Sequence, residues 1–263
     1  MPKNGDFKKL VRDRMSKTGE SYTSARMRMV RSGGGESGLP LRLAEPSGEG
    51  AMAAADGPVI YQLKITIIDI EPAIWRRVLV PAGTTLDRLH KIIQAVFGWW
   101  DYHLHQYVVD GRHYGLPDPE YSDELPTMVD ECSITLRDIL GASMIVYEYD
   151  FGDDWKHSVE IESVTMAGDP NIKYPVCTGG ARACPREDCG GTPGYSRLLE
   201  ILGDPMHEEY RKIKTWVGKK YDPEKLDLSA IDRALRKLRK PPSGIRRVAR
   251  CEPSWPCGIS GNA

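Results

Sequence analysis

Two strand-like segments joined by a proline turn constrain the fold of this chain more than any other feature. The segments are YQLKITIIDI (61–70) and AIWRRVLV (73–80). Only Glu71-Pro72 separates them, which leaves room for a tight turn and favours antiparallel pairing. The apolar region of the chain is therefore expected to begin with a β-hairpin.

A helix and a second hairpin are expected to follow. The helix is predicted behind Thr85, which can cap it, and six apolar residues at helical spacing form one stripe along it: Leu86, Leu89, Ile92, Ile93, Val96 and Phe97. HLHQYVVD (103–110) reads as a strand that runs into an Asp110-Gly111 turn, a strong hairpin signal. Both elements are expected to pack with the first hairpin.

The remaining elements alternate less regularly. SMIVYEYD (143–150) and KHSVEIESV (156–164) are expected strands flanking FGDDW, and TLRDIL (135–140) is an expected short helix. Three further helices are predicted near 194–203, 205–218 and 229–239, the last with a capping box at Ser229 and Asp232. Paired strands with inserted and C-terminal helices predict an α+β domain with a mainly antiparallel sheet.

The chain divides into four parts by composition. We expect a basic helical arm at 1–31, a flexible Gly/Ser/Pro-rich linker at 32–58, one compact domain at 59–240 and a disordered tail at 241–263. The arm is too small to bury a core of its own, so it must dock, dimerise or fold on a partner.

Charge is segregated along the chain, although the net charge is only −1. Residues 1–31 carry nine Lys/Arg and three acids, a net of +6, and residues 233–250 carry eight Lys/Arg and no acid. Residues 56–232 carry 18 basic and 30 acidic residues, a net of −12. An acidic body repels phosphate backbones, so nucleic-acid contact is expected at the basic ends. In the arm the candidates are Lys8, Lys9, Arg12, Arg14, Arg26 and Arg28, although a solvated interaction tag explains the same charges.

The sequence also indicates a compartment. No apolar run approaches the roughly 18 residues needed to cross a bilayer, and MPKNGDFKKLVRDRM lacks the apolar core of a secretion signal. We therefore expect a cytoplasmic protein without a membrane partner. In that reducing environment the six cysteines read as free thiols or metal ligands before disulfides.

Three of those cysteines lie in YPVCTGGARACPREDCGG (174–191). Cys177, Cys184 and Cys189 are separated by six and four residues. This spacing lacks the pair of cysteines two residues apart that is typical of a zinc knuckle. A tetrahedral zinc site needs a fourth ligand, for which His157 is the leading candidate, with His103 or Asp188 as alternatives. The competing interpretation, which we favour, is a rigid Gly-rich loop whose thiols are buried as small apolar groups.

Ligand-type side chains also collect in two hairpins. His103 and His105 are two residues apart and are expected on one face of a strand, while Asp150 and Asp153 crowd the turn before Trp155. These five residues form the predicted binding set. His157 shares a strand face with Val159 and Ile161, so it is expected to point toward the core. Half-buried histidines and a hairpin turn whose aspartates accept backbone N–H groups would explain the same residues without a ligand.

Three stretches together resemble one protein family. FGWWDYHLHQYVVDG, YEYDFGDDWKHSVEIE and YPVCTGGARACPREDCGGTPGY occur in the order typical of the plasmid pRiA4b open-reading-frame-three-like family, and the resemblance covers about 59–240. It implies a roll-like α+β domain found in plasmids, near mobile elements and as a module of larger bacterial proteins. It implies no established activity, and this chain departs from the simplest members by its arm, linker and tail.

Two functional hypotheses follow. Walker loops, dinucleotide-binding glycine motifs, nucleophile elbows and His-Glu-x-x-His are absent from the sequence, and no catalytic residue is assigned. We expect a non-enzymatic binding or accessory module that presents its His/Asp/Trp/Cys face to a protein or small ligand, with basic ends for nucleic acid. The alternative is a zinc-dependent enzyme, a hydrolase or nuclease accessory, in which His103, His105, His157 and the Asp150/Asp153 pair converge near the cysteine loop.

Overall fold

The computed structural model describes residues 58–117, 128–167 and 171–239. Its strands are β1 (Val59–Ile67), β2 (Trp75–Pro81), β3 (His105–Val109), β4 (Arg112–Gly115), β5 (Val129–Asp130), β6 (Ile145–Tyr149), β7 (Trp155–Met166) and β8 (Val176–Ala181). Its helices are α3 (Leu86–Phe97), α4 (Gly191–Gly203), α5 (Tyr210–Val217) and α6 (Leu228–Arg239), with a short 3-10 helix η1 (Glu131–Ser133).

The strands form one sheet in the order β5-β4-β3-β6-β7-β1-β2-β8. Neighbours pair antiparallel except for the parallel pair β4 and β5. The predicted α+β class with a mainly antiparallel sheet is confirmed. The predicted arm at 1–31 and tail at 241–263 lie outside the described residues, and so do all six arm cations expected at nucleic acid.

The predicted hairpin at the start of the domain is confirmed. β1 pairs antiparallel with β2, in a register that sets Leu63 opposite Val78 and Ile65 opposite Arg76. The same β1 pairs on its other side with β7, so it lies in the middle of the sheet. Alternate residues of these strands point into the core, where Leu63, Ile65 and Val78 are fully buried.

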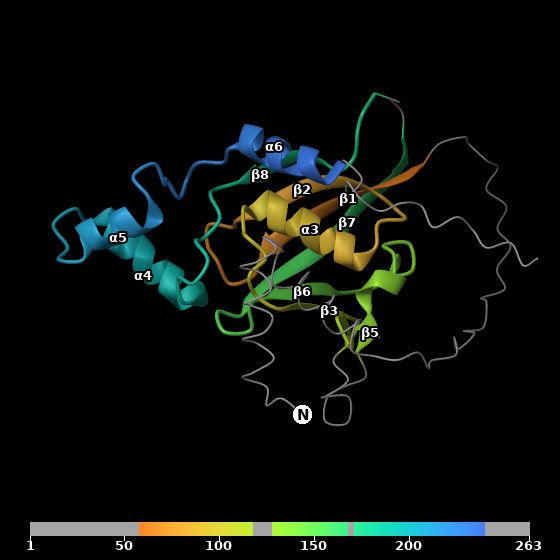
Figure 1. The fold of residues 1–263 in the computed structure, drawn as a ribbon, viewed down its shortest axis with the longest axis horizontal. Helices are drawn as coiled ribbons and strands as arrows, with labels where there is room; N and C mark the ends of the chain where they lie inside the picture. The colour runs from red at the N-terminus through yellow and green to blue at the C-terminus, as the bar shows by residue number, and fades with distance from the viewer. Residues whose placement is uncertain (1–57, 118–127, 168–170, 240–263) are drawn as a thin grey trace, which may run out of the picture.

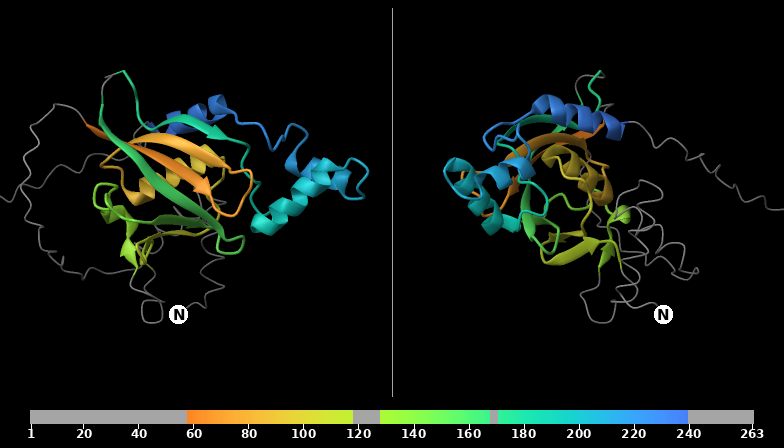
Figure 2. Two further views of the ribbon diagram at one scale, coloured as in Figure 1. Left: turned by 180° about the vertical axis from the view of Figure 1, so that it is seen from behind. Right: turned by 60° about the vertical axis from the view of Figure 1, so that its left-hand side comes forward.

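Helices cover one face of the sheet. α3 runs across that face with all six residues of its predicted apolar stripe buried, and α6 packs beside it and against β8 (Figure 1). α4 and α5 pack together at one end of the sheet, while the opposite face carries none of the described helices (Figure 2). No helix in the described part of the chain is long and apolar enough to cross a membrane.

Three local predictions were wrong. Residues 136–140 form turns instead of a helix, because their backbone bonds span three residues: the N–H of Asp138 donates to the Thr135 carbonyl at 3.0 Å and that of Leu140 to the Arg137 carbonyl at 3.3 Å. The first part of the cysteine loop is strand β8, paired with β2 at the sheet edge. The cap of α6 is Asp227, which accepts from the N–H of Ala230 at 2.9 Å, so Ser229 lies inside the helix.

Candidate functional site

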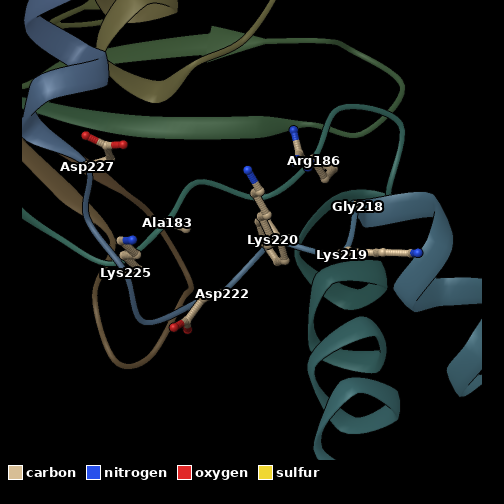
Figure 3. Close-up of a pocket in the computed structure, with 9 residues that line it drawn as sticks. Ala183, Arg186, Gly218, Lys219, Lys220, Asp222, Lys225 and Asp227 are labelled. Atoms are coloured by element: carbon tan, nitrogen blue, oxygen red, sulfur yellow. The ribbon is translucent and has the colours of Figure 1, made fainter.

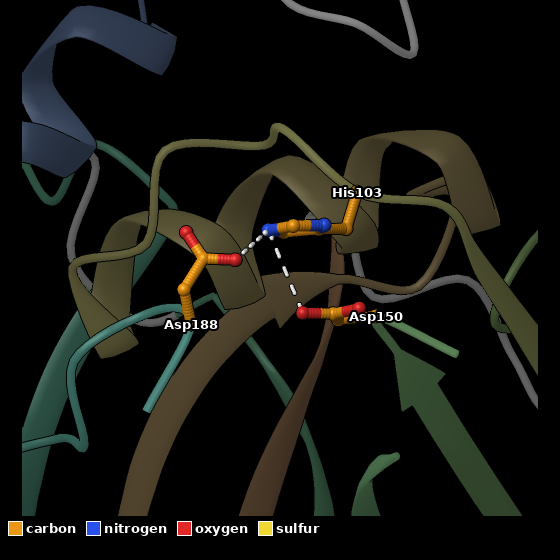
Figure 4. A group of neighbouring side chains, drawn as sticks. All are labelled: His103, Asp150 and Asp188. Atoms are coloured by element: carbon orange, nitrogen blue, oxygen red, sulfur yellow. Dashed lines mark ion pairs between the residues drawn. The ribbon is translucent and has the colours of Figure 1, made fainter. Parts of the chain in front are cut away.

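His103, Asp150 and Asp188 form a cluster where three connections meet (Figure 4). His103 precedes β3, Asp150 directly follows β6, and Asp188 lies in the loop between β8 and α4. His103 Nε2 is 3.3 Å from Asp188 Oδ1 and 3.5 Å from Asp150 Oδ2. Among the described residues this is the only group of three or more His, Cys, Asp or Glu side chains with ligand atoms all within 4.8 Å of one another.

The backbone at Asp150 turns its carboxylate toward His103. Its φ is 57°, in the left-handed region that aspartate tolerates through local hydrogen bonds. Oδ1 accepts from the N–H of Gly152 (3.1 Å) and of Asp153 (3.4 Å), as expected for an aspartate that initiates a turn. The second oxygen, Oδ2, is left to face His103.

Asp153 holds the loop that carries Asp188. Its Oδ2 accepts from the N–H of Gly190 at 3.0 Å. Gly191 lies so close to the same turn that a Cβ on it would be 2.3 Å from the Asp153 carbonyl oxygen. The glycines of the cysteine loop therefore permit a close backbone approach, and Asp153, predicted as a binding residue, instead positions Asp188.

The distances within the cluster fit a metal site better than a set of hydrogen bonds. His103 Nε2 is buried and makes no hydrogen bond, and its two carboxylate neighbours lie beyond the roughly 2.7–2.9 Å of a charge-assisted bond. A tetrahedral ion with bonds of about 2.0–2.1 Å separates its ligands by about 3.3 Å. The spacing of 3.3 and 3.5 Å matches that edge length.

His105 does not share this cluster, so the prediction that both histidines present one face to a ligand was wrong. The strand begins at His105, and His103 precedes it, so the two-residue period does not apply. The His105 ring stacks on His90 with centroids 3.5 Å apart, and its Nε2 lies 2.9 Å from Glu131 Oε2. Both His105 and Glu131 are buried.

His90 extends this buried network and was missed in the sequence. Gln94 donates to the Tyr147 hydroxyl (3.1 Å), the hydroxyl donates to His90 Nδ1 (2.7 Å), and His90 Nε2 donates to Asp101 (2.7 Å). Burial, followed by the nearby His105, lowers the pKa of His90 to about 3, which agrees with a neutral ring in this role. His90 lies four residues after Leu86, on the face of the predicted apolar stripe, and this spacing could have marked it as a buried residue.

The predicted zinc set is not brought together. Cys177 lies on β8 and Cys184 and Cys189 in the following loop, and no three of these thiols and His157 lie within 4.8 Å. All three cysteines pack half-buried against the core. Burial raises the pKa of Cys184 and raises that of Cys189 to about 12, which disfavours the thiolate that binds metal.

His157 and Trp155 lie inside the core. His157 is fully buried, as its strand face predicted, with its ring edge-on to Phe97 and Trp99 at 5.0 and 5.2 Å. Trp155, predicted as a binding residue, is also fully buried and packs 5.8 Å from Trp99. Neither side chain can reach a ligand at the surface.

An aromatic groove adjoins the cluster. It has a volume of about 760 Å³ and is bounded by the segment after α3, the loop after β8 and the end of α5. Trp100, Tyr102 and Trp216 line it with exposed rings, and Asp188 belongs both to the groove and to the His103 cluster. Trp100 is 63% exposed, whereas its neighbour Trp99 is buried.

A basic hollow lies within the acidic body, which the segregation of charge did not predict. Its volume is about 540 Å³, and Arg186, Lys219, Lys220 and Lys225 line it (Figure 3). The ammonium groups of Lys219 and Lys220 point in different directions, and the Arg186 guanidinium donates to the Val217 carbonyl at 2.7 Å. The cations therefore do not converge on one anion, and Asp222 and Asp227 line the same hollow.

Fold and cluster together define an α+β domain whose ligand-type side chains gather at one end of an antiparallel sheet. The chain belongs to the plasmid pRiA4b ORF-3-like family, whose model matches residues 59–230. The resemblance carried by the three sequence motifs is thus confirmed.

Two relatives support the assignment. "Uncharacterized protein y4hQ" of Sinorhizobium fredii is 35% identical over 180 residues, which is 67% of this chain and 90% of the relative. A crystal structure of a protein of unknown function, MM3350 from Methanosarcina mazei Go1, is 38% identical with a TM-score of 0.60. That match covers 66% of this chain and 97% of the chain of known structure.

Proposed function

We propose that this protein is a binding module that holds a divalent transition-metal ion at His103, Asp150 and Asp188. One observation carries the proposal: a buried imidazole nitrogen without a hydrogen bond lies 3.3 and 3.5 Å from two carboxylate oxygens. A buried nitrogen that makes no hydrogen bond is costly, and an ion between the three groups would remove that cost.

The donor set indicates the kind of ion. One imidazole and two carboxylates suit zinc, or manganese and iron, better than magnesium or calcium, which prefer oxygen alone. Asp150 is buried beneath the cluster, whereas the Asp188 side chain is 73% exposed. An ion bound here would have three protein ligands and would face solvent on the side of Asp188.

That open side supports the second candidate, a metal-dependent hydrolase. Catalytic zinc sites keep a coordination position for water, whereas structural sites are closed by four protein ligands. The ligand set differs from the sequence hypothesis, because His105 and His157 lie elsewhere and Asp188 takes part. The binding role is placed first because it needs no group beyond the three that the cluster supplies.

Nucleic-acid contact through the basic ends stays a prediction. Its test compares DNA binding by the full chain and by residues 56–240 in low salt, since affinity should follow the number of Lys and Arg residues. Equal affinity of the two proteins would remove the basic ends from the proposal and would direct attention to the basic hollow around Lys220.

Metal binding is tested by native mass spectrometry and calorimetry with Zn²⁺ after treatment of the protein with a chelator. The wild type should bind one equivalent, and His103→Ala and Asp150→Asn should bind none. Asparagine also tolerates the left-handed backbone at position 150, so this variant removes charge and leaves the turn. His113→Ala, on β4, is the matched control and should bind like the wild type. A chelator-treated wild type that takes up no ion, or a His103→Ala variant that still binds a full equivalent, contradicts the proposal.

A further inference from the structure

Trp100 and Tyr102 form an exposed aromatic corner beside the metal cluster. Their rings are 63% and 47% exposed, their centroids are 5.6 Å apart, and their planes meet at 87°. Between them Asp101 has a φ of 61° and turns its buried carboxylate inward to His90. The inward turn at Asp101 leaves the two flanking rings outside.

One hydrogen-bonded pair, Tyr149 and Glu187, holds the backbone of the corner. The Tyr149 hydroxyl donates to Glu187 Oε1 at 2.6 Å and accepts from the N–H of Tyr102 at 3.1 Å. Glu187 Oε2 accepts from the N–H of Trp100 at 3.1 Å. Both backbone amides of the corner are therefore fixed, and fixed aromatic rings lose little freedom on binding.

The chemistry of the groove favours an organic cation. Exposed aromatic rings offer electron-rich faces to a positive group, as in the cages that bind alkylammonium ions. Trp216 adds a third exposed ring to the same groove, and the exposed carboxylate of Asp188 stands at its rim. Arg186 is the lining cation, and it is already engaged with the Val217 carbonyl and the Tyr221 ring. Lysine and arginine side chains match such a surface.

We propose that the occupant is the chain's own N-terminal segment, residues 1–31. This segment has a net charge of +6, and residues 56–232 have a net charge of −12, so the two attract each other. The 27 residues from 32 to 58 can span up to about 90 Å when extended, which exceeds the roughly 40 Å diameter of a domain of this size. In the C-terminal basic stretch, Arg236 and Arg239 already pair with Asp232.

The experiment measures binding of a labelled synthetic peptide of residues 1–31 to full-length chains by fluorescence anisotropy. In the wild type the tethered segment competes with the peptide at a high effective concentration. A full-length variant with K8Q, K9Q, R12Q, R14Q, R26Q and R28Q should free the groove and bind the peptide at least about fivefold more tightly. Adding Trp100→Ala and Tyr102→Ala to that variant should weaken binding about tenfold, whereas adding Met144→Ala, at another exposed apolar site, should not.

The outcomes separate the occupants. Equal peptide affinity of the wild type and the six-glutamine variant would show that the groove takes a foreign basic peptide, and it would overturn the intrachain assignment. Absence of peptide binding to the six-glutamine variant would overturn the cation site itself. Neither result bears on the metal, because His103 and Asp150 are unchanged in every variant.

Discussion

His157 makes the stability of the domain depend on pH in a predictable way. Its ring is fully buried, Nδ1 lies 3.3 Å from the carbonyl oxygen of Tyr147, and Nε2 has no hydrogen-bond partner. A ring whose only polar neighbours are backbone atoms gains little from a positive charge. Burial therefore lowers the pKa of His157 from 6.5 to about 4.

The size and sign of the effect follow from that shift. Between pH 6.5 and about 4 the unfolded chain binds a proton that the folded domain does not, so the free energy of unfolding falls as the pH falls. At about 1.36 kcal/mol per pKa unit, His157 accounts for a loss of ~3 kcal/mol across this window, and the loss ends below about pH 4. His90, whose pKa is lowered to about 3, adds a loss of the same sign.

Urea unfolding followed by tryptophan fluorescence from pH 7.5 to 4 measures the effect. His157→Asn removes the titrating ring and can still offer an amide N–H to the Tyr147 carbonyl. This variant should be less stable at pH 7 but should lose ~3 kcal/mol less than the wild type on acidification. His207→Asn, in the loop before α5, is the control and should keep the wild-type slope. If the His157→Asn and wild-type curves run parallel, the reasoning from burial to pKa is refuted.

Three further substitutions test a close glycine contact, a buried arginine and the loop that carries Asp188. Gly194→Ala would place its Cβ 2.0 Å from the Cys189 carbonyl oxygen and should cost at least about 2 kcal/mol in urea unfolding, whereas Gly203→Ala in the same helix meets nothing within 4 Å and should be neutral or stabilising. Arg76→Met removes a buried guanidinium that donates to four backbone carbonyls at 2.8–3.0 Å and should cost about 2–4 kcal/mol, seen as a lower melting temperature. Asp153→Ala removes the acceptor that pins the loop of Asp188 and should weaken zinc binding about 10–100-fold in calorimetry, with an unchanged circular dichroism spectrum.

The elements with strong periodic patterns could be predicted from the sequence. The hairpin of β1 and β2 and the buried stripe of α3 follow from side-chain spacing, which depends only on local geometry. β8 was missed because VCTGGA combines glycine and cysteine, residues that do not mark a strand by themselves. Its conformation comes from pairing with β2, about 100 residues earlier in the chain.

The candidate site shows the same limit. His103 and Asp150 were singled out because histidine and aspartate are ligand types, and the structure brings them together. Their third partner, Asp188, was weighed only as an additional ligand for the thiols. Its position depends on the contact between Asp153 and Gly190, two residues that are 37 positions apart. The spacing of residues along the sequence cannot predict a contact between positions so far apart.

Adjacent residues of one short loop serve two different surfaces. Glu187 fixes the backbone amide of Trp100, while the next residue, Asp188, faces His103. An ion that fixes Asp188 would therefore also restrict the loop that supports the aromatic corner. If the ion changes the affinity of the corner for the cationic segment, thermodynamic reciprocity sets the converse effect. The bound segment must then change the affinity for the ion by the same factor.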